Sequence, residues 1–280
     1  MSSETLSTNP AYARAGGGLF TQPHFPGGRV VQATLPFLLP LAIALLWLGA
    51  TQFGWVSELI LPPPSLVWSS AVELFSSGQI FSEVGVSLSR IAWGLFIGGT
   101  LGVVLGILMA RSPTVEAYIG PTIRIIWLVP ALGWLPFLML FLGVGETLKF
   151  VMIAKTCFMP LLVTSYEGTR ALPQRYLEVA KVLELPRLTT LFKVIIPSIL
   201  PSLFAGLRLA LSKGWQALVV VELIASSSGI GYLMNWGRKL FYLDVVIVTM
   251  IVIGIVGWLI DFAMVRIESR LTAWQTRSLS

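Results

Sequence analysis

Six long apolar runs dominate the sequence and determine the fold class that it can adopt. They cover about residues 34–55, 84–110, 117–142, 147–166, 200–225 and 243–265. A helix needs about 20 apolar residues to cross ~30 Å of hydrocarbon, and each run reaches that length. Only 11% of the residues are charged, against about 25% in soluble domains. The sequence therefore predicts an all-α integral membrane protein with six transmembrane helices.

The segments between the runs indicate how the chain is organised. Residues 1–33 are rich in Gly, Pro, Ser and Thr and predict a flexible cytoplasmic tail. Residues 34–266 form the six-helix transmembrane domain, with a polar loop at about 167–199, and residues 267–280 form a second tail. Within 57–78, three prolines precede an amphipathic stretch that we expect to lie on the membrane surface.

Basic residues outside the runs are unevenly distributed. They concentrate in the two tails, in the 111–124 turn and in the 167–193 loop, whereas the 51–83 loop contains none. Lys and Arg are retained on the cytoplasmic side of membranes. The pattern predicts a multi-pass protein with both termini in the cytoplasm, and it places the 167–193 loop there too.

Several classes of function are disfavoured by the composition. The net charge of +6 is spread over separate loops, so it does not indicate nucleic-acid binding. The chain has one histidine, His24, and one cysteine, Cys157, too few for a catalytic or metal centre built on these residues. No G-x-x-x-x-G-K-[ST] phosphate loop occurs, because GVGETLK at 143–149 has the wrong spacing. We therefore expect a chain that is not an enzyme and binds neither metal nor ATP.

Two helix patterns carry more specific information. Gly98, Gly102 and Gly106 are four residues apart and predict a helix face that packs closely against a neighbouring helix. In the 173–187 segment, one expected helix face carries apolar residues and the other carries charged ones. This predicts a short helix that either docks into a groove on a partner protein or packs on its own chain. The apolar face holds Tyr176, Val179, Ala180 and Leu183, the charged face holds Glu178, Lys181 and Glu184, and Pro186 ends the helix.

The 176–201 segment resembles the EAA loop of ABC importer permeases. Glu178-Val179-Ala180 stands at the family's Glu-Ala-Ala triplet, and Ile195-Ile196-Pro197 stands at its closing motif. Glu184 departs from the family pattern, which has a turn-forming glycine there. Further stretches resemble the nitrate, sulfonate and taurine branch of that family, namely LPPPSLVW (61–68), SLSRIAWGLFIGG (87–99), VPALGWLPFLMLFLGVGETLK (129–149), GLRLALSKGW (206–215), VVVELIASSSGIGYL (219–233) and RLTAW (270–274).

The resemblance implies a type I ABC importer permease in a bacterial inner membrane. It implies a homodimer, two separate ATPase subunits that bind ATP and Mg²⁺, and a periplasmic or lipid-anchored binding protein. The 173–187 helix would couple to the ATPase. Aliphatic sulfonate or taurine is the expected substrate, with nitrate, bicarbonate or another small solute as the alternative. An ATP-independent transporter or channel is a lesser alternative, for which internal repeats would be expected; none is seen.

Ionisable residues within the runs are candidates for the translocation pathway, because such groups are costly at membrane depth. A cation facing the pathway would suit an anionic substrate, and a lysine paired with an acid such as Glu222 or Asp261 is the alternative. Glu222 itself is either part of a gate or a structural partner. Snorkelling or structural pairing is expected for Arg90 and Arg208, and a structural ion pair for Asp261. The predicted pathway residues are Lys155, Lys213, Trp215, Gln216 and Glu222. Trp127 and Trp134 lie in a proline-broken segment at 127–136 that either forms a wall of the pathway or serves plain packing.

Overall fold

The computed structural model describes residues 29–271, with side chains described from residue 38 onward. The chain divides into two units, 1–55 and 56–280. The described part of the first unit is one helix, α1 (Arg29–Gln52). The predicted 1–33 tail therefore lies outside the described residues except for 29–33, which are helical. The end of the second predicted tail, 272–280, lies outside them as well.

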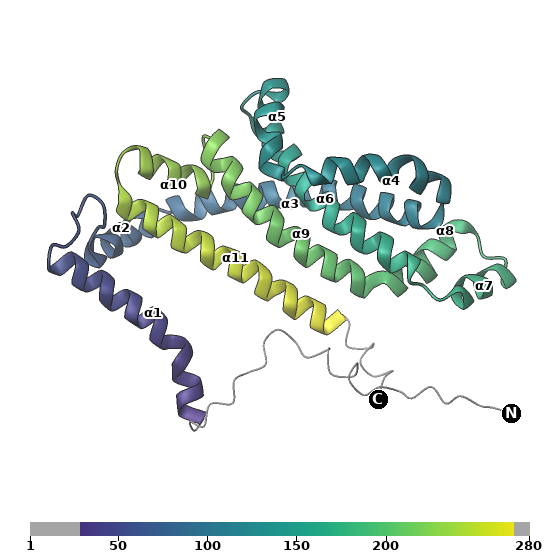
Figure 1. The fold of residues 1–280 in the computed structure, drawn as a ribbon, viewed down its shortest axis with the longest axis horizontal. Helices are drawn as coiled ribbons and strands as arrows, with labels where there is room; N and C mark the ends of the chain where they lie inside the picture. The colour runs from purple at the N-terminus through teal and green to yellow at the C-terminus, as the bar shows by residue number, and fades with distance from the viewer. Residues whose placement is uncertain (1–28, 272–280) are drawn as a thin grey trace, which may run out of the picture. The chain divides into compact units, whose positions relative to one another are not determined.

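In the described part of the second unit, every regular element is a helix and there is no β-strand (Figure 1). The helices α3, α6 and α9 run side by side, and α11 lies along α9. The short helices α7 and α8 lie at one end of this bundle. The elements are α2 (Pro64–Ser76), α3 (Gln79–Arg111), α4 (Pro113–Leu128), η2 (Ala131–Trp134), α5 (Leu135–Leu142), α6 (Glu146–Arg170), α7 (Gln174–Val182), α8 (Arg187–Thr190), a π-helical turn η3 (Leu191–Ile195), α9 (Ile196–Ala225), α10 (Ile230–Lys239) and α11 (Leu243–Leu271).

The glycine face of α3 packs directly on the backbone of α6, as its spacing predicts. A Cβ added at Gly98 would lie 2.0 Å from the carbonyl oxygen of Ala154, and one at Gly102 would lie 2.4 Å from that of Phe158. Gly106 meets α6 in the same way one turn further on. Only residues without a side chain allow two helix backbones to approach so closely. The prediction of a packing face is confirmed.

The contact of α6 with α9 also depends on small residues. A Cβ at Gly206 would lie 2.0 Å from Thr164 Oγ1, and one at Gly214 would lie 2.7 Å from Cys157 Sγ. Cys157 is completely buried in this contact. The three helices α3, α6 and α9 therefore form one tightly packed core, and Cys157 belongs to its packing.

The predicted break in the 117–142 run is confirmed. The pair α4 and η2–α5 bends by 94°, with Pro130 at the start of η2 and Pro136 in the first turn of α5. A proline lacks the N–H that would continue the preceding helix, so the chain turns there.

Four described helices are long and apolar enough to cross a membrane, and the bent pair makes a fifth. The first run appears as a shorter apolar stretch, Leu38–Gln52. The number of six spans is compatible with these helices and stays a prediction.

Candidate coupling and pathway sites

The predicted coupling segment forms α7 and ends in a Schellman motif. The N–H of Leu185 donates to the carbonyl of Ala180, and the N–H of Glu184 donates to that of Lys181, each at 3.0 Å. These two bonds define the motif, which needs a left-handed residue between them. Glu184 supplies it with φ of 49°. The turn that glycine would form easily is therefore kept here by a glutamate.

The faces of α7 differ from the predicted division. Ala180 is 4% exposed, and Leu177 packs against the buried cluster of Ile107, Ile195 and Ile199. Ala180 was expected on the docking face, but it faces the protein itself because Leu177 and Ala180, three residues apart, together form the inner side. A surface of apolar side chains remains exposed beside Glu178, Glu184 and Pro186, which are also exposed. It consists of Tyr176, Val179, Val182 and Leu183, and Val182 is 82% exposed.

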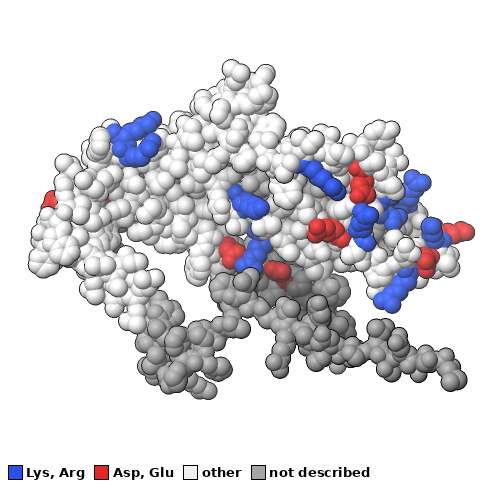
Figure 2. Space-filling model, in the orientation of Figure 1, with Lys and Arg blue, Asp and Glu red and all other residues white. Residues whose placement is uncertain are grey.

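Charged side chains gather over the end of the bundle where α7 and α8 lie (Figure 2). Most of the rest of this face carries no charge. This separation of a charged end from an apolar body suits a loop in water next to helices in lipid.

A buried ion-pair cluster lies toward the other end of the core and includes Glu222. Arg90 is 2% exposed and Glu222 is completely buried. Arg90 donates all five of its N–H groups: two to Glu146 at 2.6 and 2.8 Å, one to Glu222 at 2.7 Å, and two to the carbonyl and Oγ of Ser228, both at 2.7 Å. Lys149 donates to Glu146 at 2.7 Å. The cluster joins α3, α6 and α9 and contains two positive and two negative charges.

Glu222 also fixes the start of α10. Its carboxylate accepts from the N–H of Gly231 at 3.0 Å and from Ser87 Oγ at 2.8 and 2.9 Å. Gly229 precedes α10 with φ of 103°, and a Cβ there would lie 2.3 Å from the same carboxylate. Glu222 thus has structural partners on every side, which is one of the two roles left open for it.

The sequence did not point to Glu146, Ser87 or Ser228 as members of this cluster. Glu146 offered one signal, because an acid at the start of an apolar helix needs a partner at membrane depth. The expected pairing of Asp261 is also resolved. Asp261 accepts two bonds from Arg208, at 2.7 and 3.1 Å.

The two candidate lysines have no acidic partner among the described residues. Lys213 and Gln216 are both exposed and lie on one face of α9. Trp215, expected beside them on the pathway, is 6% exposed, and with Gln216 it lines a small groove of about 190 Å³ between α9 and α11 that does not include Lys213. The Nε1 of Trp215 donates to the carbonyl of Ile253 at 3.3 Å, and Gly257 makes room for its ring. Trp215 therefore packs α9 against α11. It points away from Lys213 because residues two apart on a helix lie on different sides of it.

The broken wall holds its two tryptophans differently. Trp127 is exposed, whereas Trp134 is partly buried and packs against a cluster that includes Leu148 and Met152 of α6. Lys155 Nζ lies over the Trp134 ring, 5.1 Å from its centroid. The structure thus brings Lys155 and Trp134 together.

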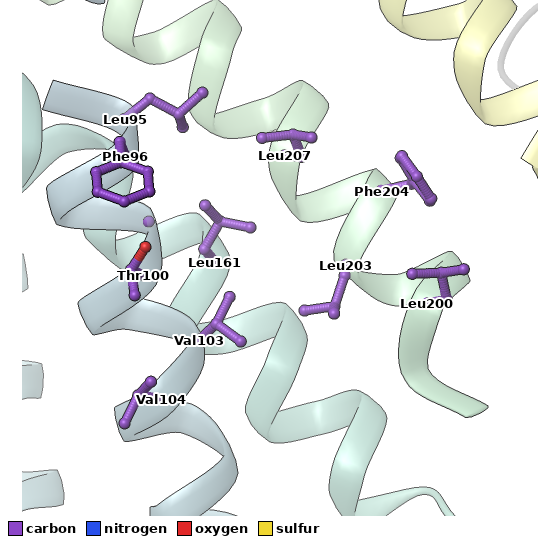
Figure 3. Close-up of a pocket in the computed structure, with 11 residues that line it drawn as sticks. Leu95, Phe96, Thr100, Val103, Val104, Leu161, Leu200, Leu203, Phe204 and Leu207 are labelled. Carbon is purple, nitrogen blue, oxygen red and sulfur yellow. The ribbon is translucent and has the colours of Figure 1, made fainter. Parts of the chain in front are cut away.

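A larger groove of about 440 Å³ lies between α3 and α9. Figure 3 shows Val103, Leu161 and Leu203 pointing toward its interior from three different helices. Thr100 is the one residue of the lining with a polar side chain. The groove offers an anion no charge and almost no hydrogen bonds, so it suits hydrocarbon instead.

Comparison with known proteins agrees with this architecture. Residues 102–273 match the family described as "Binding-protein-dependent transport system inner membrane component". The structure is similar to a chain of the MetNI methionine ABC transporter in an inward-facing conformation. The TM-score is 0.58 at 17% identity, covering 66% of this chain and 93% of that one. At this identity the likeness shows the fold alone.

Three relatives of known name cover most of the chain. The putative aliphatic sulfonates transport permease protein SsuC of Bacillus subtilis is 34% identical, over 85% of this chain and 86% of the relative. The taurine transport system permease protein TauC of Escherichia coli is 31% identical, over 87% and 90%. The bicarbonate transport system permease protein CmpB of a Synechocystis species is 29% identical, over 84% and 87%. The chain therefore belongs to the ABC importer permeases, in the nitrate, sulfonate and taurine family.

Proposed function

We propose that this chain forms the translocation pathway of an ATP-driven importer for a small organic anion, with aliphatic sulfonate or taurine as the substrate. The single observation that carries the anion is the pair of uncompensated lysines in the spans. Lys213 is exposed on α9 beside Gln216, and neither Lys213 nor Lys155 has an acidic partner in the described chain. A cation in a site of low dielectric attracts an anion far more strongly than it would in water.

The names of the relatives support the choice of substrate. Two of them are named for sulfonates and for taurine, and both are more than 30% identical to this chain. Bicarbonate is the second candidate, because a relative named for it is 29% identical. Nitrate stays with it as a small oxyanion of the same charge.

The energy for transport would come from separate subunits. The exposed apolar surface of α7 supports this part of the proposal, because an amphipathic helix with an uncovered apolar side fits a groove on a partner. Two ATPase subunits that bind ATP and Mg²⁺ would dock there, beneath a homodimer of this chain. The α7 end would face the cytoplasm with both termini, and a binding protein would deliver substrate from the other side.

The substrate can be tested with the importer reconstituted in liposomes from this chain, its ATPase and its binding protein. Taurine, ethanesulfonate, nitrate and bicarbonate are added one at a time, and ATP hydrolysis and uptake are measured. Stimulation by taurine or ethanesulfonate is the expected result. Stimulation by bicarbonate or nitrate alone would make that anion, and not a sulfonate, the proposed substrate. Uptake by this chain without any ATPase would overturn the coupling.

The coupling surface can be tested separately by co-purification with the ATPase. We expect Val179→Glu to weaken the association, because it puts a charge into an apolar contact without touching the core of the chain. Val144→Glu is the matched control, since Val144 is equally apolar and exposed but precedes α6, at the opposite end of that helix from α7. Equal co-purification of both variants and wild type would contradict docking through α7.

A further inference from the structure

Lys155 occupies the tenth position of α6. At 1.5 Å per residue it lies about 14 Å from the start of the helix, close to the middle of a ~30 Å hydrocarbon layer. Its Nζ makes no ion pair with any described residue. A lone ammonium at this depth is costly and marks a functional site by default.

The two acids of the ion-pair cluster, Glu146 and Glu222, already accept hydrogen bonds from other groups. Glu146 accepts from Arg90 and Lys149, and Glu222 accepts from Arg90, Ser87 and the N-terminus of α10. Glu146 is also nine residues away on the same helix, more than two turns. The cation is therefore without an acidic partner among the described residues, and it is partly exposed.

Trp134 offers a second unpaired donor beside it. Its indole Nε1 is buried, and it has no hydrogen-bond partner among the described residues. The ring itself lies under Lys155 Nζ. The cation–π contact offsets part of the cost of placing the ammonium here, but the indole N–H gains nothing from it. A buried N–H without an acceptor is destabilising. The ammonium of Lys155 and the indole N–H of Trp134 are thus two neighbouring donors that both lack an acceptor in the described chain.

We propose that Lys155 and Trp134 form a contact site for the oxyanion head of the transported substrate, at the break of the α4–η2–α5 span. The site rests on the proposed function and adds where inside the membrane the anion is held. A sulfonate carries one negative charge on three oxygens, so it accepts from the ammonium and the indole N–H together. Leu135, Leu148 and Met152 are buried and pack around Trp134, so they fix the position of its ring beside Lys155.

The small number of donors suits a site that must release its ligand. Conduction requires contacts that are favourable enough for entry and weak enough for exit. Arg90 shows the other extreme, because all five of its donors have protein acceptors in the structure. Two donors at the break would therefore bind an anion transiently and weakly enough for it to be released.

The test measures the maximal uptake rate of taurine and of ethanesulfonate by the complete reconstituted importer. Lys155→Met keeps the length of the side chain and removes its charge, and Trp134→Phe keeps an aromatic ring and removes the N–H. We expect losses of about tenfold and about threefold, typical of a charged and a neutral hydrogen bond. Lys239→Met, an exposed lysine of α10 outside the site, is the control and is expected to transport as wild type does.

The double variant separates a shared site from two packing defects. If both donors hold one anion, Trp134→Phe adds little to the loss that Lys155→Met already causes. Losses that multiply would overturn the shared site, and so would wild-type uptake by Lys155→Met. If Lys155→Met fails to assemble, Trp134→Phe alone decides, and unchanged uptake overturns the site. A wild-type importer that moves no oxyanion overturns the proposed function itself, which the variants cannot do.

Discussion

Replacing Glu184 by glycine is expected to stabilise the turn that follows α7. Glu184 adopts φ of 49°, and its conformation makes possible the bond from the N–H of Leu185 to the carbonyl of Ala180. A side chain in the left-handed region brings its Cβ close to the following carbonyl oxygen. Glycine adopts the same conformation without that contact, and the two backbone bonds of the motif stay in place.

The size of the effect follows from two opposing terms. The left-handed conformation costs an L-residue about 1–2 kcal/mol. Glycine has more freedom in the open state, and ordering it costs about 0.5–1 kcal/mol. The net gain is about 0.5–1 kcal/mol, so the equilibrium for opening the turn falls by a factor of about two to five.

Hydrogen exchange in lipid nanodiscs measures this local opening. We expect the amides of residues 184 and 185 to exchange about two to five times more slowly in Glu184→Gly, after correction for intrinsic rates. Glu184→Ala is the control, because it removes the carboxylate and keeps the Cβ. Slowing by alanine as large as that by glycine would refute the backbone argument and assign the effect to the charge. Unchanged exchange in the glycine variant would refute it as well.

Three further substitutions in the core and one control outside it are tested by thermal unfolding of the purified chain. Gly98→Ala is expected to cost about 3 kcal/mol, because its Cβ meets backbone that cannot move aside, whereas Gly254→Ala, with open space around it, should be neutral or slightly stabilising. Glu222→Gln is expected to cost about 3–5 kcal/mol by leaving the buried Arg90 with one acidic partner fewer, and an unchanged midpoint would contradict the cluster as a source of stability. Trp215→Phe loses one hydrogen bond and should cost about 1 kcal/mol.

Features that depend on nearby residues could be predicted from the sequence. Span length, the spacing of Gly98, Gly102 and Gly106, and the prolines at 130 and 136 each act over a few turns of one helix. The same holds for the existence of α7. Its end does not follow, because Pro186 was expected to end the helix, whereas α7 ends at Val182 and the left-handed Glu184 makes the turn. The direction of its faces does not follow either, because Tyr176, Val179 and Ala180 could all belong to one apolar side until the core beneath them is known.

The partners of polar groups lie too far along the chain for such reasoning. Arg90 meets Glu146 and Glu222, which are 56 and 132 residues away, and no spacing rule connects them. Lys155 and Trp134 come from separate helices, and nothing in the sequence places one beside the other. Trp215 adjoins Lys213 in sequence, yet it points toward α11, which only the packing of that helix reveals.

The separation of the partners of Arg90 has a consequence for how the chain is made. Glu222, which pairs with Arg90, follows it by 132 residues in the chain. A ribosome adds about 5–20 residues per second, so Glu222 is synthesised roughly 7–26 seconds after Arg90. During that interval α3 must enter the bilayer with its guanidinium held by water or lipid headgroups. Glu146 arrives first and can take two of the five donors. We expect nascent chains that end before residue 222 to leave α3 less firmly inserted than chains that extend beyond it.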